Sequence, residues 1–243
     1  MPLAKNLSRR LLRPGQALLS SRGPIRNADN WTDRRPPIAG TVRFAMTKSD
    51  LRRIFLERRK ALSPAVLNEK SRRIAELFFS SVDLSRIKLL HTFIPLESRG
   101  EVDTSLITHG VWSRWPEIEI AVPRVNFKTH ELESLAYTTE VELCENAWGV
   151  REPAGGEMID PQTIDVVLVP LLCFDEHGFR VGYGKGYYDR FLKSCRPDCL
   201  KIGLSIFPPV GRITDLHAGD VPLDLAVTPE KVFRREIGSE FLV

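Results

Sequence analysis

The sequence has 243 residues, of which 42% are hydrophobic, and a formal net charge of +4. This length and composition suit one large domain or two small ones around an ordinary core, and no apolar run reaches the roughly 18 residues of a membrane-spanning helix. Residues 1–45 hold 9 Lys/Arg and 2 Asp/Glu, or +7, whereas the remaining 26 basic and 29 acidic residues give −3. Because the body is slightly acidic and has no spanning segment, we expect it to bind neither nucleic acid nor membranes. We also expect a monomer, although neither charge nor composition determines the oligomeric state.

The basic segment 1–45 is rich in Arg, Pro and Ser, is poor in acids, and lacks sustained apolar periodicity. Such a composition predicts disorder. It also suits an organelle transit peptide. Met46 stands just before the first predicted helix, so residues 1–45 alternatively reflect a start placed too far upstream, or a solvated tail. We expect a cytoplasmic protein, or a mitochondrial or plastid one if the segment is a transit peptide.

The four cysteines favour ordinary thiols in a reducing compartment. They are Cys144, Cys173, Cys195 and Cys199. A chain of this size with so few cysteines indicates no disulfide framework. The single C-x3-C pair has no second pair or histidine nearby, which argues against a zinc site.

Two helices are predicted at the start of the folded region. The segment 47–62 carries its apolar residues near one helical face: Leu51, Ile54, Phe55 and Leu62. Ser63 can cap a second helix, and Pro64 suits its first turn. The apolar face of that second helix includes Ile74, Leu77 and Phe78. We expect an ordinary helix pair, with a basic outer face on the first helix.

Strands and helices alternate along the rest of the chain. The predicted strands are 87–94, 118–124, 132–137, 164–170, 201–207 and 223–228, and the predicted helices are 103–112 and 186–195. Continuous apolar strands separated by helices are typical of a mostly parallel sheet covered on both faces. We therefore predict an α/β, three-layer domain over residues 46–243.

A glycine-rich turn follows the predicted strand 164–170, in "VGYGKGYYDRFL" at 181–192. Its glycines occupy every second position: Gly182, Gly184 and Gly186. Glycines let backbone N–H groups approach an anion closely, and the following helix adds its positive end. Because ligands of open α/β sheets bind beyond the carboxyl ends of strands, a phosphate is the natural guest.

Glycines alone would favour a plain turn, but the neighbouring charges favour a binding site. Arg180 and Lys185 supply two cations and Asp189 a carboxylate that can bind a metal ion. The motif is not a Walker A loop, because Lys185 is followed by glycine and the G-x4-GK spacing is absent. Nor does it match the dinucleotide fingerprint.

At this point the sequence resembles the 5-formyltetrahydrofolate cyclo-ligase family, also called 5,10-methenyltetrahydrofolate synthetase. The shared motifs, in chain order, are "KSDLR", "GEVDT", "WGVREP", "FDEHGFRVGYGKGYYDRFL" and "GDVPLDLAVT". The similarity covers roughly residues 47 to 230. It implies an ATP- and Mg²⁺-dependent ligase that closes 5-formyltetrahydrofolate to 5,10-methenyltetrahydrofolate and releases ADP and phosphate.

The resemblance also implies roles for individual residues. The ATP-binding residues would be Lys48, Arg52, Arg180, Val181, Gly182, Tyr183, Gly184, Lys185, Gly186, Tyr187 and Tyr188. The substrate-binding residues would be Ile94, Glu101, Trp148, Tyr183, Gly184, Lys185, Gly186 and Tyr187. Lys185 and Arg180 would be catalytic, and Asp189 and Asp220 would hold Mg²⁺ through hard oxygen ligands.

Plainer interpretations remain for several of these residues. Lys48 and Arg52 can belong to a solvated basic face, as their neighbours Arg53, Arg58, Arg59 and Lys60 show how common such charges are here. Asp220 and Asp224 can be solvated loop acids. A lone tryptophan such as Trp148 is more often part of a core than of a ligand site.

Three departures from the family pattern affect substrate geometry. Tyr183 stands where many members carry arginine, "FPPVGR" replaces a stretch that commonly contains glutamine, and "FIPLESRGEVDT" is about two residues longer than in some relatives. Ile94 is consequently aligned less securely than Glu101.

Two other functions fit the same sequence features. A sugar-phosphate isomerase or an acyl-CoA transferase can share this kind of scaffold but consumes no ATP. A folate- or nucleotide-binding protein without catalysis would bind the ligands without turnover. ATP consumption separates both from a ligase.

Overall fold

The computed structural model describes residues 28–30, 45–146 and 149–235. The helices are α1 (Lys48–Lys60), α2 (Pro64–Ser81), α3 (Ser105–Arg114) and α4 (Tyr187–Ser194), with short 3-10 helices η1 (Glu97–Arg99) and η2 (Pro161–Thr163). The strands are β1 (Ala28–Asn30), β2 (Leu89–His91), β3 (Glu119–Asn126), β4 (Glu131–Ala136), β5 (Leu143–Glu145), β6 (Arg151–Pro153), β7 (Val166–Pro170), β8 (Cys173–Phe174), β9 (Arg180–Val181), β10 (Leu200–Leu204), β11 (Leu225–Val227) and β12 (Val232–Arg234).

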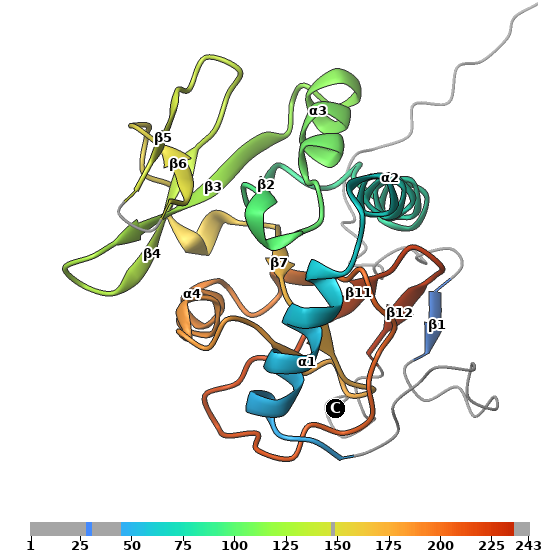
Figure 1. Ribbon diagram of the computed structural model, residues 1–243. Coiled ribbons are helices and arrows are strands. Elements are labelled where there is room, and N and C mark those ends of the chain that lie inside the picture. Colours follow the sequence, from blue (N-terminus) through green and yellow to red (C-terminus); the bar gives the residue numbers. More distant parts are fainter. Residues whose placement is uncertain (1–27, 31–44, 147–148, 236–243) are drawn as a thin grey trace, which may run out of the picture.

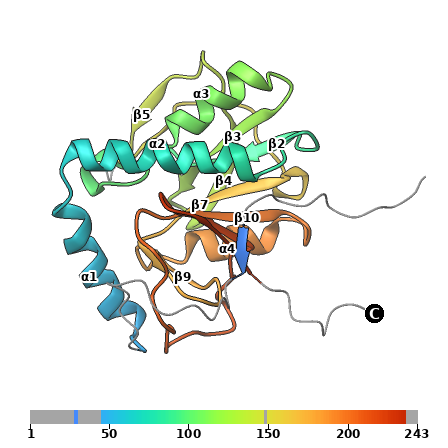
Figure 2. The same cartoon turned by 90° about the vertical axis from the view of Figure 1, so that its right-hand side faces the viewer.

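Eight strands form one central sheet in the order β1-β12-β11-β10-β7-β2-β3-β4. The pairs β11–β12 and β3–β4 are antiparallel, and the other neighbouring pairs are parallel. Helices α2 and α3 cover one face of the sheet and α4 covers the other (Figures 1 and 2). The predicted three-layer α/β domain with a mostly parallel sheet is confirmed.

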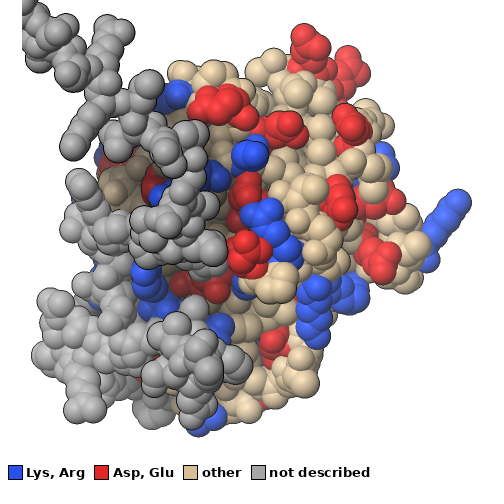
Figure 3. All heavy atoms as spheres, turned by 180° about the vertical axis from the view of Figure 1, so that it is seen from behind, with Lys and Arg blue, Asp and Glu red and all other residues tan. Residues whose placement is uncertain are grey.

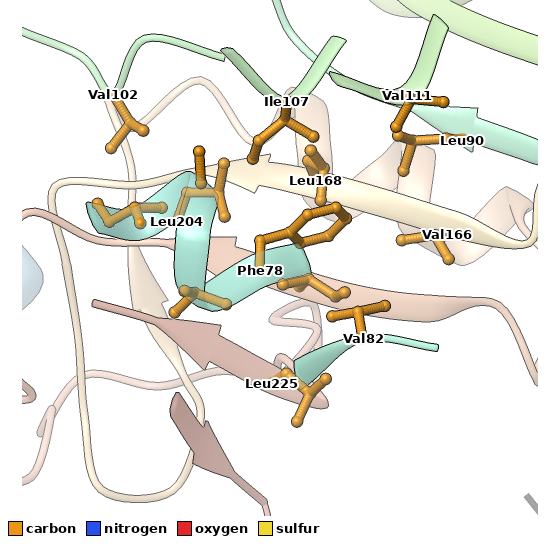
Figure 4. Close-up of a cluster of buried hydrophobic side chains, with 14 of the residues drawn as sticks. Phe78, Val82, Leu90, Val102, Ile107, Val111, Val166, Leu168, Leu204 and Leu225 are labelled. Carbon is orange, nitrogen blue, oxygen red and sulfur yellow. The ribbon is translucent and has the colours of Figure 1, made fainter. Parts of the chain in front are cut away.

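The core of the domain lies on both faces of the sheet, as the continuous apolar run at 164–170 requires. Val166 and Leu168 of β7 point into the cluster under α2 and α3, whereas Val167 and Val169 point to the opposite cluster under α4. Figure 4 shows Phe78 of α2 in the first of these clusters, together with Val166 and Leu168. Such a strand buries both faces, which explains its lack of polar alternation.

Helix α1 lies apart from these layers and packs on the hairpin formed by β8 and β9. Its buried residues Leu51 and Phe55 belong to the face predicted from the sequence. The Thr47 side chain accepts a hydrogen bond from the Asp50 N–H and so caps the helix start. Helix α1 therefore lies beside the segment that contains the glycines, because β9 leads directly into it.

Within the segment 1–45, the structure describes residues 28–30 and 45. Ala28–Asn30 form β1, which pairs in parallel with β12 at the edge of the sheet. The sequence analysis expected no strand here, because three residues give too short a pattern to show a period. The other residues of the segment lie outside the described part of the chain, so their disorder stays a prediction.

The surface mixes charges of both signs. Figure 3 shows acidic and basic side chains interspersed on the face opposite to that of Figure 1. Within the described residues, no helix combines the length and apolar character that crossing a membrane would need.

The buried histidine of β2 gives a testable pH effect. His91 is fully buried, its ring lies 4.7 Å from that of Phe191, and neither ring nitrogen has a hydrogen-bond partner in the described residues. Burial lowers the pKa of His91 from 6.5 to about 3. Since the folded pKa is depressed, this contribution to stability is present above pH 6.5 and is lost as pH falls toward 3. The full loss is on the order of 5 kcal/mol.

We expect His91→Leu to flatten the fall of unfolding free energy between pH 6.5 and 3. Urea unfolding at a series of pH values measures this slope. The exposed His109 supplies a matched control, and His109→Leu should keep the wild-type slope. An unchanged slope in His91→Leu would show that other groups govern acid unfolding.

Candidate active site

A cleft of about 940 Å³ opens where the carboxyl ends of β2, β3 and β7 meet. Ile94 follows β2, Pro123 lies in β3, and Pro170 ends β7; all three line the cleft. The strand order reverses between β2 and β7, because β3 lies on one side of β2 and β7 on the other. Ligands of open α/β sheets bind at such a switch point.

The glycine segment forms one wall of this cleft. Gly184 and Gly186 have φ of 87° and 69°, values that residues with a side chain adopt reluctantly. A Cβ on Gly184 would also lie 3.0 Å from the Arg52 guanidinium carbon. Gly186 caps α4, so the helix N-terminus opens toward the same space. The local geometry thus requires glycine and supplies backbone N–H groups for an anion.

Lys185 is the cation of this loop that remains available to a ligand. Its side chain is exposed, it lines the cleft, and its ammonium makes no ion pair with any described residue. Its role as a phosphate-binding lysine stays a prediction.

Arg180, in contrast, is held by the protein. Its side chain is 5% exposed, it donates to the Val221 carbonyl, and it forms an ion pair of 2.9 Å with Asp189 Oδ1. Burial lowers the pKa of Arg180, an effect that the nearby carboxylates of Asp189 and Asp220 oppose. Arg180 lines the cleft, but its contacts also make it a support for Asp189.

Helix α1 contributes two further cations. Arg52 Nε donates to the Gly182 carbonyl at 2.9 Å, which ties α1 to the glycine loop. Lys48 Nζ forms an ion pair of 2.5 Å with Asp220 Oδ2, and the two side chains are 15% and 11% exposed. The alternative of a solvated basic face is therefore wrong for these two residues.

The two predicted metal ligands, Asp189 and Asp220, both line the cleft. Asp189 Oδ1 accepts from Arg180 and from the Val221 N–H at 3.1 Å, whereas Oδ2 accepts no hydrogen bond from the described residues. Both oxygens of Asp220 accept from Lys48 Nζ. Although burial favours its neutral form, these bonds and the His217 N–H lower the pKa of Asp220, so it is a carboxylate.

Two carboxylates suit a hard cation whose remaining ligands are oxygens of phosphate and water. Among the described residues, no group of three or more His, Cys, Asp or Glu side chains could hold a metal ion. Mg²⁺ usually keeps one or two carboxylates plus phosphate and water. Asp189 fits that role directly, and Asp220 fits it by sharing its oxygens with Lys48. Asp224, the neighbouring acid, instead pairs with Lys201 at 2.8 Å.

The opposite wall of the cleft carries Glu101, which is only 6% exposed. Its Oε2 accepts from the Leu96 N–H at 2.9 Å, and its Oε1 accepts from the Tyr183 hydroxyl at 2.7 Å. The glycine loop is thus linked to the segment after β2. Ile94 lies on the same wall.

The remaining predicted residues differ in how they reach the cleft. Tyr187 is half-buried, and the Arg190 guanidinium lies over its ring, 5.2 Å from the ring centre. Val181 is 1% exposed and packs under α1, and the Tyr188 hydroxyl is buried with no described partner. Val181 and Tyr188 therefore anchor the two ends of the glycine loop in the protein interior. Trp148 lies outside the described residues.

One residue that contacts the glycine loop was not predicted from the sequence. Arg59, assigned there to the solvated basic face of α1, is only 4% exposed. It donates to the Leu171 carbonyl and, through NH1, to the Tyr183 hydroxyl at 3.3 Å. The signal was the spacing: Arg59 follows Arg52 by seven residues, or two helical turns, and so shares its face.

Glu101 should be costly to the stability of the fold. Burial, the largest influence, raises the pKa of its carboxyl above 4.5, although hydrogen bonds from Leu96 and Tyr183 oppose the shift. A raised folded pKa stabilises the protein below pH 4.5, and that contribution is lost as pH rises through the folded value. Near neutral pH the buried charge is therefore destabilising.

We expect Glu101→Gln to raise the melting temperature near neutral pH and to converge with the wild type below pH 4.5. Turnover should fall in the same variant, because the carboxylate faces the cleft. Calorimetry across pH checks the first part and a rate assay the second. Glu117→Gln, at an exposed position, should change neither; a Glu101→Gln protein less stable than wild type at neutral pH would refute the argument.

The fold and the cleft together define an α/β protein with a glycine-rich loop beside the cleft at its switch point, the usual ligand site of such sheets. A family model described as the "5-formyltetrahydrofolate cyclo-ligase family" matches residues 45–229. The chain belongs to this family, and it is a ligase.

Individual relatives agree with that assignment. The Escherichia coli (strain K12) protein named 5-formyltetrahydrofolate cyclo-ligase is 27% identical over 187 residues, covering 73% of this chain and 97% of the relative. The Arabidopsis thaliana protein named 5-formyltetrahydrofolate cyclo-ligase, mitochondrial, is 27% identical over 230 residues, covering 81% and 82%. The solved structure of Aquifex aeolicus 5,10-methenyltetrahydrofolate synthetase is 31% identical with a TM-score of 0.68, covering 82% and 97%.

Proposed function

We propose that the protein converts 5-formyltetrahydrofolate to 5,10-methenyltetrahydrofolate, with ATP as co-substrate, Mg²⁺ as cofactor, and ADP and phosphate as products. The observation that carries the proposal is the composition of one cleft. A cationic glycine loop for phosphates and the buried Glu101 for the N–H groups of a pterin ring line the same 940 Å³. Family membership supports the substrate.

The chemistry needs ATP because an N-formyl group is an amide. Its carbon resists attack by N10 of the folate until the formyl oxygen becomes a leaving group. Transfer of the γ-phosphoryl group to that oxygen gives an imidate phosphate and ADP. N10 then forms a bond to the formyl carbon and gives up its proton to solvent, and the C–O bond breaks with release of phosphate. The formyl oxygen leaves on the phosphate.

The residues of the chain serve this reaction by position and charge. Lys185 and the N–H groups of the glycine loop stabilise the charge that develops on the transferred phosphoryl group. Arg180 holds Asp189, and Arg52 holds Gly182, so that the loop is formed before the substrate arrives. No side-chain nucleophile is required.

Asp189 and Asp220 would hold Mg²⁺ in this scheme. The ion would neutralise charge on the phosphates. Lys48 pairs with Asp220 in this structure. When Asp220 holds the ion, the Lys48 ammonium would be released to pair with a phosphate.

Absorbance spectroscopy tests the proposal. Purified protein mixed with 5-formyltetrahydrofolate, ATP and Mg²⁺ should produce the ultraviolet absorption of the methenyl product. Omission of ATP should abolish it. Product formation without ATP would favour an isomerase or transferase, and ligand binding without turnover would favour a binding protein.

We infer that residues 1–45 are separable from catalysis. The described residues that line the cleft all lie at or beyond Lys48, and Met46 is anchored by hydrogen bonds with Arg212 and Thr214. A protein that starts at Met46 should therefore keep its kcat/KM, which the absorbance assay measures. A loss of activity would show that the segment contributes to the cleft.

The cytoplasmic location is a separate proposal. A fluorescent reporter fused to residues 1–45 should stay in the cytoplasm. Accumulation in mitochondria or plastids would show that the segment is a transit peptide, as the name of the Arabidopsis relative suggests for that protein.

A further inference from the structure

Three side chains from distant parts of the sequence are linked by hydrogen bonds beside the cleft, and two of them, Glu101 and Tyr183, line it. Arg59 NH1 donates to the Tyr183 hydroxyl at 3.3 Å, and that hydroxyl donates to Glu101 Oε1 at 2.7 Å. Arg59 NH2 donates to the Leu171 carbonyl just after β7. These bonds thus join α1, the glycine loop and the segment after β2.

The tyrosine is fixed on more than one side. The Arg99 guanidinium lies over the Tyr183 ring, 5.0 Å from its centre, while Arg59 and Glu101 meet at its hydroxyl. Tyr183 itself stands in the glycine loop, between Gly182 and Gly184. Any movement of the loop therefore moves the partner of the Glu101 carboxylate.

Glu101 also stands at a boundary within the site. A second cavity of about 680 Å³ lies beside the cleft, and Phe93, Ile94, Arg99 and Glu101 line both. A carboxylate in this wall could turn toward either space. Its two hydrogen bonds, from Leu96 and from Tyr183, leave it one orientation.

Arg59 is held in place at an energetic cost. Its side chain is buried, yet its Nε has no hydrogen-bond partner in the described residues. A buried unpaired donor is unfavourable by about 1 to 3 kcal/mol. The hydrogen bonds that Arg59 donates to Tyr183 and Leu171 oppose that cost, so the arginine is held by these two partners.

We propose that Arg59 and Tyr183 are positioning residues: Arg59 orients the Tyr183 hydroxyl, and Tyr183 holds the Glu101 carboxylate in the orientation that receives the folate ring. This inference rests on the proposed function. It assigns Tyr183 to the folate side of the reaction, and it adds Arg59, which does not line the cleft and would act through Tyr183.

The proposal is tested by steady-state kinetics with each substrate varied in turn. Tyr183→Phe removes one hydroxyl and should raise KM for 5-formyltetrahydrofolate by about 10- to 100-fold, the range for a hydrogen bond to a charged group. KM for ATP should stay unchanged, because the glycine backbone is retained. Arg59→Lys keeps the positive charge but loses the planar guanidinium, which donates to two partners at once. It should raise KM for 5-formyltetrahydrofolate by a smaller factor and leave KM for ATP unchanged.

Arg53→Met is the matched control on the same helix. The Arg53 side chain is 73% exposed, and among the described residues its one ion pair is with Asp50, at 3.9 Å. This variant should show wild-type KM values for both substrates. Melting temperatures of all variants show whether each is folded at the assay temperature, and Tyr183→Phe serves if Arg59→Lys does not fold.

A double-mutant cycle separates positioning from independent binding. If Tyr183 acts through Glu101, the Tyr183→Phe change should have little further effect on the folate KM in a Glu101→Gln background. Additive effects, a rise in the ATP KM instead, or wild-type values in Tyr183→Phe would each overturn the proposal. If the wild-type protein itself makes no methenyl product, the proposed function fails instead, and the two failures are distinct.

Discussion

Replacing Lys185 by alanine should lower kcat/KM for the formation of methenyl product at least about 100-fold, the loss typical when a preorganised charge partner is removed. Lys185 is the loop cation whose ammonium makes no ion pair with the described residues, so its charge is available to a phosphoryl group. Its removal takes nothing from the core. The absorbance assay measures the rate, and an unchanged melting temperature shows that the loss is chemical.

Two variants accompany this measurement. Lys185→Arg should recover little activity, because a planar guanidinium does not reproduce a compact ammonium. Lys128→Ala removes an exposed lysine from the turn between β3 and β4 and should leave the rate unchanged. Near-normal turnover in Lys185→Ala would show that this lysine is only a solvated loop cation.

Replacing either Asp189 or Asp220 by asparagine should raise the Mg²⁺ concentration needed for half-maximal rate. Each change removes one unit of charge from a hard-cation site and keeps the side-chain shape. Because the two would serve one ion, the double variant should lose less than the sum of the single losses in free energy. Rate measurements over a Mg²⁺ titration, at saturating ATP and folate, give both quantities.

Asp224→Asn is the internal control, since Asp224 pairs with Lys201 rather than facing the cleft. It should keep the wild-type Mg²⁺ response even if it lowers stability. If the Mg²⁺ requirement changed in Asp224→Asn but not in Asp220→Asn, the assignment of Asp220 as the second ligand would be wrong. Wild-type responses in Asp189→Asn and Asp220→Asn alike would make both carboxylates structural partners of Arg180 and Lys48.

Much of the fold could be predicted because its signals are local and long. The helices α1 and α2 show an apolar face over several turns, and both begin at a capping residue, Thr47 or Ser63. The run at 164–170 indicated a strand buried on both faces, and β7 is such a strand. These patterns report burial directly, which is why they survive without knowledge of the fold.

The short pieces could not be predicted for the same reason. The hairpins β5–β6 and β8–β9 have strands of two or three residues, too few to show a period. Their pairing depends on tertiary contacts, such as α1 on β8 and β9. Strand β12, of three residues, was missed likewise.

The sequence predicted many of the residues that line the cleft, but not which of them pair with one another. The local motif placed Arg180, Lys185 and Asp189 in one loop, and the structure keeps them in one cleft. The ion pair of Lys48 with Asp220 joins residues 172 positions apart, which no local pattern can reveal. Arg59 was missed because a charged helix residue is usually solvated.

Isotope transfer tests most directly the claim that ATP activates the formyl oxygen. 5-Formyltetrahydrofolate labelled with oxygen-18 in its formyl group is converted in unlabelled water, and the released phosphate is analysed by mass spectrometry. In the proposed reaction the formyl oxygen leaves on the phosphoryl group, so one labelled oxygen should appear in each phosphate formed, in step with the methenyl product. Unlabelled phosphate, with the label released to water, would contradict an imidate phosphate intermediate and the role assigned to the glycine loop.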